Sequence, residues 1–154
     1  MTGHILCIIL SHIFMLTKLR QKGAVKGFKR TPQRLAILEY LEGNTSHPSA
    51  ETIYQAVAKK HRSMSFATVY NTLNTLVAAG AVRDLTIDPE RRRFDPNTHP
   101  HHHLLCLDCR KVVDVPGPIS AEVPGSIAEN YTVVGHHIEF YGYCAPCGKK
   151  QVVR

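Results

Sequence analysis

The chain of 154 residues lacks a hydrophobic run long enough to cross a membrane as a helix. Its most apolar stretch, residues 3–16, falls short of the roughly 20 residues that a bilayer requires. No lysine or arginine precedes this stretch and no clear small-residue cleavage site follows it, so it is a poor secretory signal peptide. We therefore expect translation to begin at Met15, which makes residues 1–14 an extension outside the native protein.

The chain also lacks the usual signatures of an enzyme. It has no convincing series of serine, histidine and aspartate and no glycine-rich phosphate loop. His137-Ile-Glu139 followed by Pro146-Cys147 is close to the zinc deaminase pattern, but that pattern requires a cysteine at the position of Lys150. We therefore predict a protein that is not an enzyme.

Acidic residues are scarce in the first part of the chain. Residues 1–94 contain 14 Lys and Arg against 6 Asp and Glu, whereas residues 95–154 contain 5 against 6. A basic segment with the pattern of a folded domain indicates nucleic-acid binding, although a solvated basic face has the same composition. We predict two pieces, a DNA-binding domain at residues 15–95 and a metal-binding domain at residues 96–154.

Cysteine occurs as one outlier, Cys7, and two Cys-x-x-Cys pairs in the second half. This usage fits metal binding in a reducing compartment, the cytoplasm, better than a secreted disulfide framework. Four thiolates can form a closed tetrahedral cage for Zn²⁺, and the alternative is disulfides or unlinked thiol pairs. The predicted structural zinc ligands are Cys106, Cys109, Cys144 and Cys147.

A second set of ligand types overlaps the first cysteine pair. Asp95 precedes a run of four histidines in five residues, and Asp114 follows it. On an extended strand, His101 and His103 point to one side and His102 to the other, so alternate histidines can share one ion. The alternative is an exposed polar loop. Imidazoles with carboxylates predict a second metal site whose chemistry differs from that of the thiolate cage.

Three helices are predicted in the basic half, each beginning after a residue with a capping hydroxyl. They start after Thr31, Ser49 and Ser65 and end near Gly43, Lys60 and Gly80. Two short extended runs at residues 81–86 and 91–95 then predict a hairpin. Three helices followed by a hairpin is the order of a winged helix, with a short linker between the last two helices as in a helix-turn-helix.

The third helix has a polar face whose short side chains and one tyrosine suit contacts with groove edges and phosphates. The arginines of the hairpin would form a basic wing beside the DNA backbone, and the alternative is an ordinary exposed polar surface. The polar face also carries Thr75, and the arginine run continues to Arg93. The predicted DNA-binding residues are Ser65, Thr68, Tyr70 and Asn71 on the helix and Arg91 and Arg92 on the hairpin.

The second half is predicted to be an α+β unit. A unit this small is expected to need a bound metal ion that cross-links the chain. Residues 101–107, 111–115 and 131–143 have the pattern of strands, and residues 119–130 that of a helix interrupted by Pro124-Gly125. The whole chain is therefore predicted to be α+β.

Several motifs occur together and in order over about residues 18–150: Thr31-Pro-Gln-Arg34, Ala36-Ile-Leu38, His47-Pro48, Ala67-Thr-Val-Tyr-Asn71, Arg93-Phe-Asp95, His101-His-His103, Cys106-x-x-Cys109 and Tyr141-Gly-Tyr-Cys144. This set resembles the ferric uptake regulator (Fur) family of bacterial metal-responsive repressors. The resemblance implies a homodimer with an N-terminal winged helix and a C-terminal dimerisation domain, in which metal binding closes the DNA-binding arms onto a palindromic operator.

The resemblance also implies a regulatory metal site in addition to the structural zinc site. Its donor set suits Fe²⁺, Mn²⁺ or Zn²⁺. Because its ligands come from both halves of the chain, one ion would fix the angle between the two domains. The implied regulatory ligands are His47, Asp95, His101, His103 and Asp114.

In having aspartate at position 114, the chain resembles the peroxide-sensing (PerR-like) branch, whose members have aspartate at the matching position. In that branch, ferrous iron reacts with peroxide and oxidises its own histidine ligands, which correspond to His47 and His101. Within the family, a zinc- or manganese-specific uptake regulator is the alternative, and outside it a zinc-ribbon interaction module without DNA binding. Many iron-sensing members have a further metal site, for which this chain has Pro100 in place of one histidine and His102, His136 and Glu122 as candidates.

Overall fold

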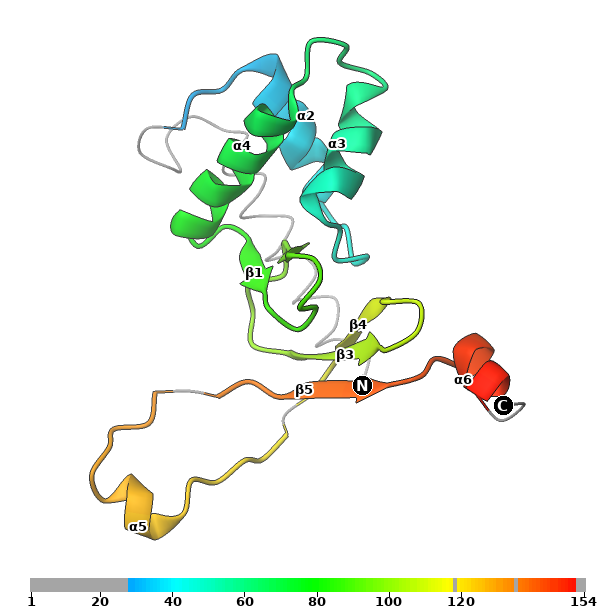
Figure 1. Ribbon diagram of the computed structural model, residues 1–154. Helices are drawn as coiled ribbons and strands as arrows, with labels where there is room; N and C mark the ends of the chain where they lie inside the picture. Colours follow the sequence, from blue (N-terminus) through cyan, green and yellow to red (C-terminus); the bar gives the residue numbers. More distant parts are fainter. Residues whose placement is uncertain (1–27, 118, 135, 152–154) are drawn as a thin grey trace, which may run out of the picture. The chain divides into compact units, whose positions relative to one another are not determined.

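The computed structural model describes residues 28–117, 119–134 and 136–151, and the predicted extension at residues 1–14 lies outside them. The chain divides into two compact units, the first ending at His99 and the second beginning at Pro100. Helices and sheets occur together, which confirms the predicted α+β class (Figure 1). None of the helices within these ranges has the length and apolar character needed to span a membrane.

The first unit begins with three helices, α2 (Pro32–Leu41), α3 (Ala50–Ala58) and α4 (Phe66–Ala78). The side chain before each helix accepts a hydrogen bond from a backbone N–H of the first turn, which stabilises the helix start. The three predicted caps, Thr31, Ser49 and Ser65, are confirmed. Gly43 and Gly80 follow the first and third helices with φ of 68° and 67°, the left-handed conformation that glycine adopts without strain.

The hydrophobic core of this unit lies between the three helices. Its fully buried side chains include Leu38, Ile53, Leu73 and Leu76, which come from the apolar faces of all three helices. Phe94, from the strand pair that follows, is also completely buried and belongs to the same cluster. The core therefore fixes this strand pair to the helices.

The predicted hairpin is present, with shorter strands than expected. β1 (Arg83–Leu85) pairs antiparallel with β2 (Arg93–Asp95). The connecting loop is closed by an ion pair, in which Arg93 Nη2 lies 2.9 Å from Asp88 Oδ2. The amide of Phe94 donates to the carbonyl of Pro48 at 3.0 Å, so the hairpin is also tied to the segment that precedes α3.

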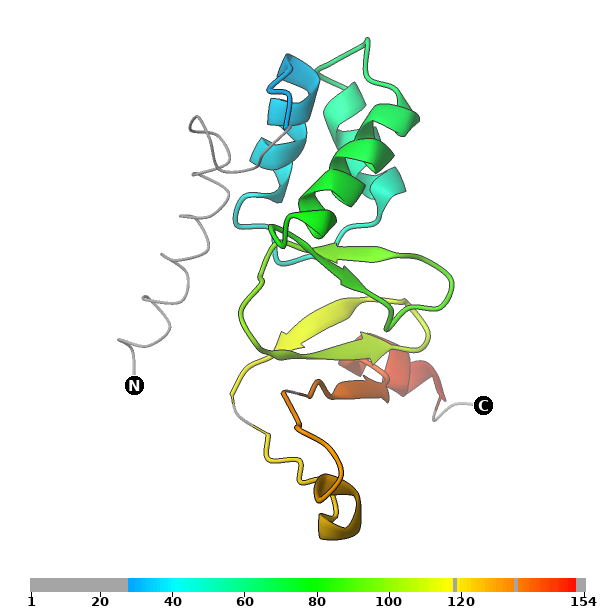
Figure 2. The same ribbon diagram turned by 90° about the vertical axis from the view of Figure 1, so that its left-hand side faces the viewer.

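The second unit contains a three-stranded sheet in the order β4-β3-β5 (Figure 2). β3 (His102–Cys106) pairs antiparallel with β4 (Val112–Val115) and parallel with β5 (Glu139–Gly142). The prediction of one long strand at residues 131–143 was wrong over most of its length. Only residues 139–142 find partners on β3, and the described residues before them form no strand.

Two short helices complete the second unit. α5 (Gly125–Ala128) is a single turn that starts after Pro124, so the expected interruption of the 119–130 segment by Pro124-Gly125 is confirmed. α6 (Ala145–Gln151) was not predicted. Its sequence signals are Pro146 in the first turn, where a missing N–H costs nothing, and two lysines in the last turn.

Replacement of Ile53 by alanine should lower the free energy of unfolding of the first unit by about 2–5 kcal/mol, because a fully buried side chain is removed from the core. Urea denaturation of the full chain, followed by circular dichroism at fixed metal concentration, measures this change. Gln55→Ala on the exposed side of the same helix is the control and should shift stability by no more than about 0.5 kcal/mol. Equal effects of the two variants would contradict the described core.

Candidate metal and DNA-binding sites

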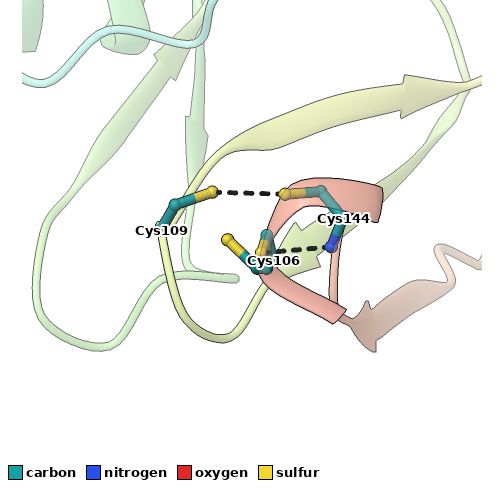
Figure 3. A group of neighbouring side chains, drawn as sticks. Cys106, Cys109 and Cys144 are labelled. Atoms are coloured by element: carbon teal, nitrogen blue, oxygen red, sulfur yellow. Dashed lines mark hydrogen bonds between the residues drawn. The ribbon is translucent and has the colours of Figure 1, made fainter. Parts of the chain in front are cut away.

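The four predicted zinc ligands come from two turns of the second unit. Cys106 ends β3 and Cys109 lies in the turn to β4, whereas Cys144 precedes α6 and Cys147 lies in its first turn. Figure 3 shows three of these side chains directed toward one another. In the turn between β3 and β4, the amide of Arg110 donates a hydrogen bond to the carbonyl of Cys106 at 2.9 Å, and Arg110 has a φ of 60°.

The spacing of the four sulfur atoms fits a zinc ion. All four lie within 4.8 Å of one another, and Cys109 Sγ lies 3.8 Å from Cys144 Sγ. A tetrahedron with Zn–S bonds of about 2.3 Å has sulfur–sulfur edges of about 3.8 Å. All four cysteines are free thiols, so the structure does not pair them as disulfides.

The thiols of this cluster differ in acidity. The amide of Cys144 donates to Cys106 Sγ at 3.3 Å and lowers the pKa of Cys106 to about 6. A hydrogen bond with Asp108 raises the pKa of Cys147 instead. The two thiols therefore differ in how readily they lose a proton, and metal binding has to displace the protons that remain.

The first histidine–carboxylate pair lies in the first unit. His47 Nε2 is 3.9 Å from Asp95 Oδ1. The pair is brought together by β2, which ends at Asp95 and is hydrogen-bonded through Phe94 to Pro48, the residue after His47. His47 itself has a φ of 49°, an uncommon conformation for a residue with a side chain. One imidazole and one carboxylate form only part of a metal site.

The second histidine–carboxylate group lies in the second unit. Asp114 Oδ1 is 3.3 Å from His101 Nε2 and 3.7 Å from His103 Nε2. The two imidazole rings are 4.4 Å apart between centroids. His103 lies directly opposite Asp114 in the ladder between β3 and β4, so the pairing register sets this contact. Two imidazoles and one carboxylate therefore converge here.

His102 has different partners from its two neighbours. Its Nδ1 accepts a hydrogen bond from the amide of Ile138 at 3.1 Å, and its ring stacks on His136 with centroids 5.9 Å apart. Burial, together with the nearby His136, lowers the pKa of His102 and favours its neutral form. Among the residues that the structure describes, His102 and His136 do not form a cluster of metal-ligating atoms with Glu122.

The polar face of α4 is divided between helix contacts and exposed groups. The hydroxyl of Ser65 caps the helix and lies 2.8 Å from that of Thr68, and Thr75 donates to the carbonyl of Asn71 at 2.8 Å. These hydroxyls are therefore used within the helix. Ser65, Tyr70 and Asn71 of the predicted set are exposed, and only Tyr70 and Asn71 among these three lie within the helix itself.

Two of the three consecutive arginines on the hairpin form ion pairs within it. Arg92 contacts Asp84, with Nε 3.1 Å from Oδ2, and Arg93 contacts Asp88. Arg91 is exposed. Asn74 was missed by the sequence reasoning and lies on this surface, where its Oδ1 accepts from Arg92 Nη1 at 3.3 Å. Its position four residues after Tyr70, hence on the same helix face, was the available signal.

The sequence model of the ferric uptake regulator family matches residues 25–141, most of the chain. The chain belongs to the ferric uptake regulator family. The peroxide operon regulator of Bacillus subtilis (strain 168) is 42% identical over 127 residues, which cover 81% of this chain and 88% of that protein. The peroxide-responsive repressor PerR of Staphylococcus epidermidis is 43% identical over 124 residues, covering 79% of this chain and 82% of that protein.

A solved structure agrees with these relatives. The Vibrio cholerae ferric uptake regulator has a TM-score of 0.64 at 33% identity, covering 83% of this chain and 99% of that one. The predicted family is thus confirmed, and so is the predicted function as a metal-dependent transcriptional regulator of the Fur family. The relatives named for peroxide also match the predicted resemblance to the peroxide-sensing branch.

Proposed function

We propose that this Fur-family regulator is a peroxide-responsive repressor, which binds its operator while its regulatory metal site is filled and releases it after oxidation. The observation that carries this proposal is the position of Asp114, within 3.7 Å of both His101 and His103. An aspartate at this position is the feature in which the chain resembles the peroxide-sensing branch. The names of the Bacillus and Staphylococcus relatives support the same assignment.

The regulatory metal would be bound by both histidine–carboxylate groups together. The group in the first unit supplies one nitrogen and one carboxylate, and the group in the second unit supplies two nitrogens and one carboxylate. Three imidazoles with two carboxylates suit Fe²⁺, Mn²⁺ or Zn²⁺, whereas neither group alone offers a complete shell. Ligands shared between the units would make metal occupancy favour one arrangement of the two, which is the coupling that a repressor needs. The proposed ligands are His47, Asp95, His101, His103 and Asp114.

Peroxide sensing would depend on the same ligands. When bound, ferrous iron supplies the electrons that reduce peroxide beside the imidazole rings. His47 and His101 are the residues that we expect to gain oxygen. An oxidised imidazole ring is a poorer nitrogen donor to the metal. The protein would therefore release the metal and then dissociate from the operator.

The cysteine cluster would hold a structural zinc ion. Its four sulfurs converge with the spacing of a tetrahedral shell. A closed thiolate shell leaves no open position for substrate or peroxide, which suits a structural role. The proposed zinc ligands are Cys106, Cys109, Cys144 and Cys147.

DNA binding would use the first unit and dimerisation the second, in the cytoplasm. Three helices followed by a hairpin have the order of a winged helix, with α4 as the helix that enters the major groove of a palindromic operator. The second unit exposes large apolar side chains that a second copy could cover. These include Val123, Ile127, Tyr131, Val133 and Val134, of which Val134 is 97% exposed.

Operator binding should require a divalent metal. We expect Mn²⁺ to produce a specific complex with promoter DNA in a gel shift, and we expect its affinity to fall steeply with salt because phosphate contacts release counterions. A variant with His47, His101 and His103 all changed to alanine should bind with the same weak affinity at every metal concentration. Complexes that form equally well with and without metal, in both proteins, would overturn the proposed function.

Peroxide should modify the iron-loaded protein at specific histidines. After brief treatment of the Fe²⁺ form, tryptic peptides that contain His47 or His101 should gain the mass of one oxygen, and operator binding should decrease. The Mn²⁺ form is the control and should show neither change. The conservative variant Asp114→Glu should alter this response while its zinc content stays the same. An iron form whose two histidines remain unmodified would rule out peroxide sensing by this route.

Loss of one thiolate should empty the cysteine cluster. We expect one tightly held zinc per chain in the parent protein after dialysis against EDTA, and almost none in Cys109→Ser, with a lower melting temperature as well. Ser120→Ala is the control, because Ser120 is an exposed residue of the second unit outside the cluster, and it should retain the metal. Elemental analysis with parallel thermal denaturation measures both quantities. Full zinc retention by Cys109→Ser would exclude this residue as a ligand.

A further inference from the structure

A polar cluster within the first unit connects the hairpin to the exposed face of α4. Its centre is Arg92, whose guanidinium donates to Asp84 on β1 and to Tyr70 and Asn74 on the helix. The distance from Nη1 to the Tyr70 hydroxyl oxygen is 2.8 Å. The contact with Asp84 raises the pKa of Arg92 and keeps it charged.

Aromatic rings hold this cluster in place. The Arg92 guanidinium carbon lies 5.6 Å from the centre of the Tyr70 ring and 5.5 Å from that of Phe94, which is fully buried. Both distances are within the range of a cation–π interaction. The centre of the Tyr70 ring is also 6.4 Å from that of the Phe66 ring. The Arg92 guanidinium is therefore held by the ring of Phe94, which belongs to the core, and by the carboxylate of Asp84 on its own hairpin.

The direction of the hydrogen bonds has a chemical consequence. A guanidinium group has only donors, so the Tyr70 oxygen and the Asn74 side-chain oxygen must both act as acceptors toward Arg92. The Tyr70 hydroxyl hydrogen and the Asn74 amide hydrogens are then left to point at other partners. Tyr70 and Asn74 lie one helical turn apart and are both exposed. Together they form a surface that offers hydrogen-bond donors.

We propose that Arg92 is a positioning residue for DNA recognition, which fixes Tyr70 and Asn74 as outward-facing donors rather than contacting phosphate itself. This inference rests on the proposed function of the first unit in DNA binding. In the major groove guanine offers two acceptors and the hydrogen-bonding group of thymine is an acceptor, whereas adenine places an amino donor beside its N7 acceptor and cytosine offers an amino donor. A surface with several donors therefore pairs best with a guanine or thymine on the strand that α4 reads.

The alternative role for Arg92 is a direct phosphate contact, as its place in an arginine triplet indicates. A phosphate contact has no preference among bases, and its loss weakens binding to all sequences alike. The two roles therefore differ in what a change at Arg92 does to base preference. Lysine is the informative replacement, because it keeps the charge but cannot donate to Asp84, Tyr70 and Asn74 in the fixed geometry of a guanidinium.

The experiment uses the full chain loaded with Mn²⁺ and a duplex DNA library with a randomised core. The parent protein first selects its preferred sequence, and dissociation constants are then measured on that duplex, on all its single base-pair variants and on random DNA. Arg92→Lys, Tyr70→Phe and the double variant are compared with Arg91→Lys, a charge-preserving change at the exposed neighbouring arginine. The ratio between specific and random DNA is the main readout, because an inactive fraction of protein affects both constants equally.

We expect Arg92→Lys to lose about tenfold in discrimination at one guanine or thymine in each half-site, at little cost on random DNA. Tyr70→Phe should lose preference at the same position, and the double variant should lose little more, since both changes remove one donor arrangement. Arg91→Lys should keep the parental profile. A profile unchanged in Arg92→Lys, or a loss that is equal on every sequence, would overturn the positioning role.

Failure of the proposed function would look different. In that case the parent protein itself would enrich no sequence from the library in the presence of metal. If the parent selects a sequence and Arg92→Lys selects the same one with the same discrimination, DNA binding stands and only the role of Arg92 is rejected. Asp84→Asn gives an independent check, because release of the Arg92 anchor should weaken the same base preference without removing the arginine.

Discussion

The hydrogen bond from the Phe94 amide to the Pro48 carbonyl is the constraint on which the first unit depends. It places His47 beside Asp95, and it holds β2 where Phe94 can complete the core. Arg92 immediately precedes β2 and packs over the Phe94 ring. The arginine proposed to position the DNA-facing side chains, the core residue Phe94 and the proposed metal ligand Asp95 therefore lie within four consecutive residues.

The second unit depends on a different feature, its cluster of cysteines. Within the part of it that the structure describes, the buried apolar side chains are Leu105, Cys106, Val112 and Cys147. Two of these four are cysteines of the proposed zinc cage, so the unit has little hydrophobic core apart from its thiols. A small unit of this kind buries little apolar surface, and a zinc ion in the proposed cage would cross-link its two turns.

Local signals in the sequence were sufficient for the helices of the first unit. A capping hydroxyl acts on the next few residues, so Thr31, Ser49 and Ser65 identified three helix starts correctly. Non-local pairing was not accessible in the same way. The extent of β5 depends on how many residues of β3 face it, and the fixing of Arg92 by Asp84 depends on the hairpin register. Cysteine spacing and the family resemblance predicted both groups of metal ligands, which stay a prediction, whereas the contacts of Asp114 with His101 and His103 became visible only in the fold.

The hydrogen bond between the Ile138 amide and His102 Nδ1 has a consequence for the choice of ligands. A ring nitrogen that accepts a hydrogen bond has its lone pair occupied, and in the neutral ring the other nitrogen then carries the proton. His102 can therefore coordinate an ion only after breaking this bond. The His102 ring also lies on the opposite side of the strand from its two neighbours. The tripeptide therefore offers His101 and His103, and not the ring between them, to an ion beside Asp114.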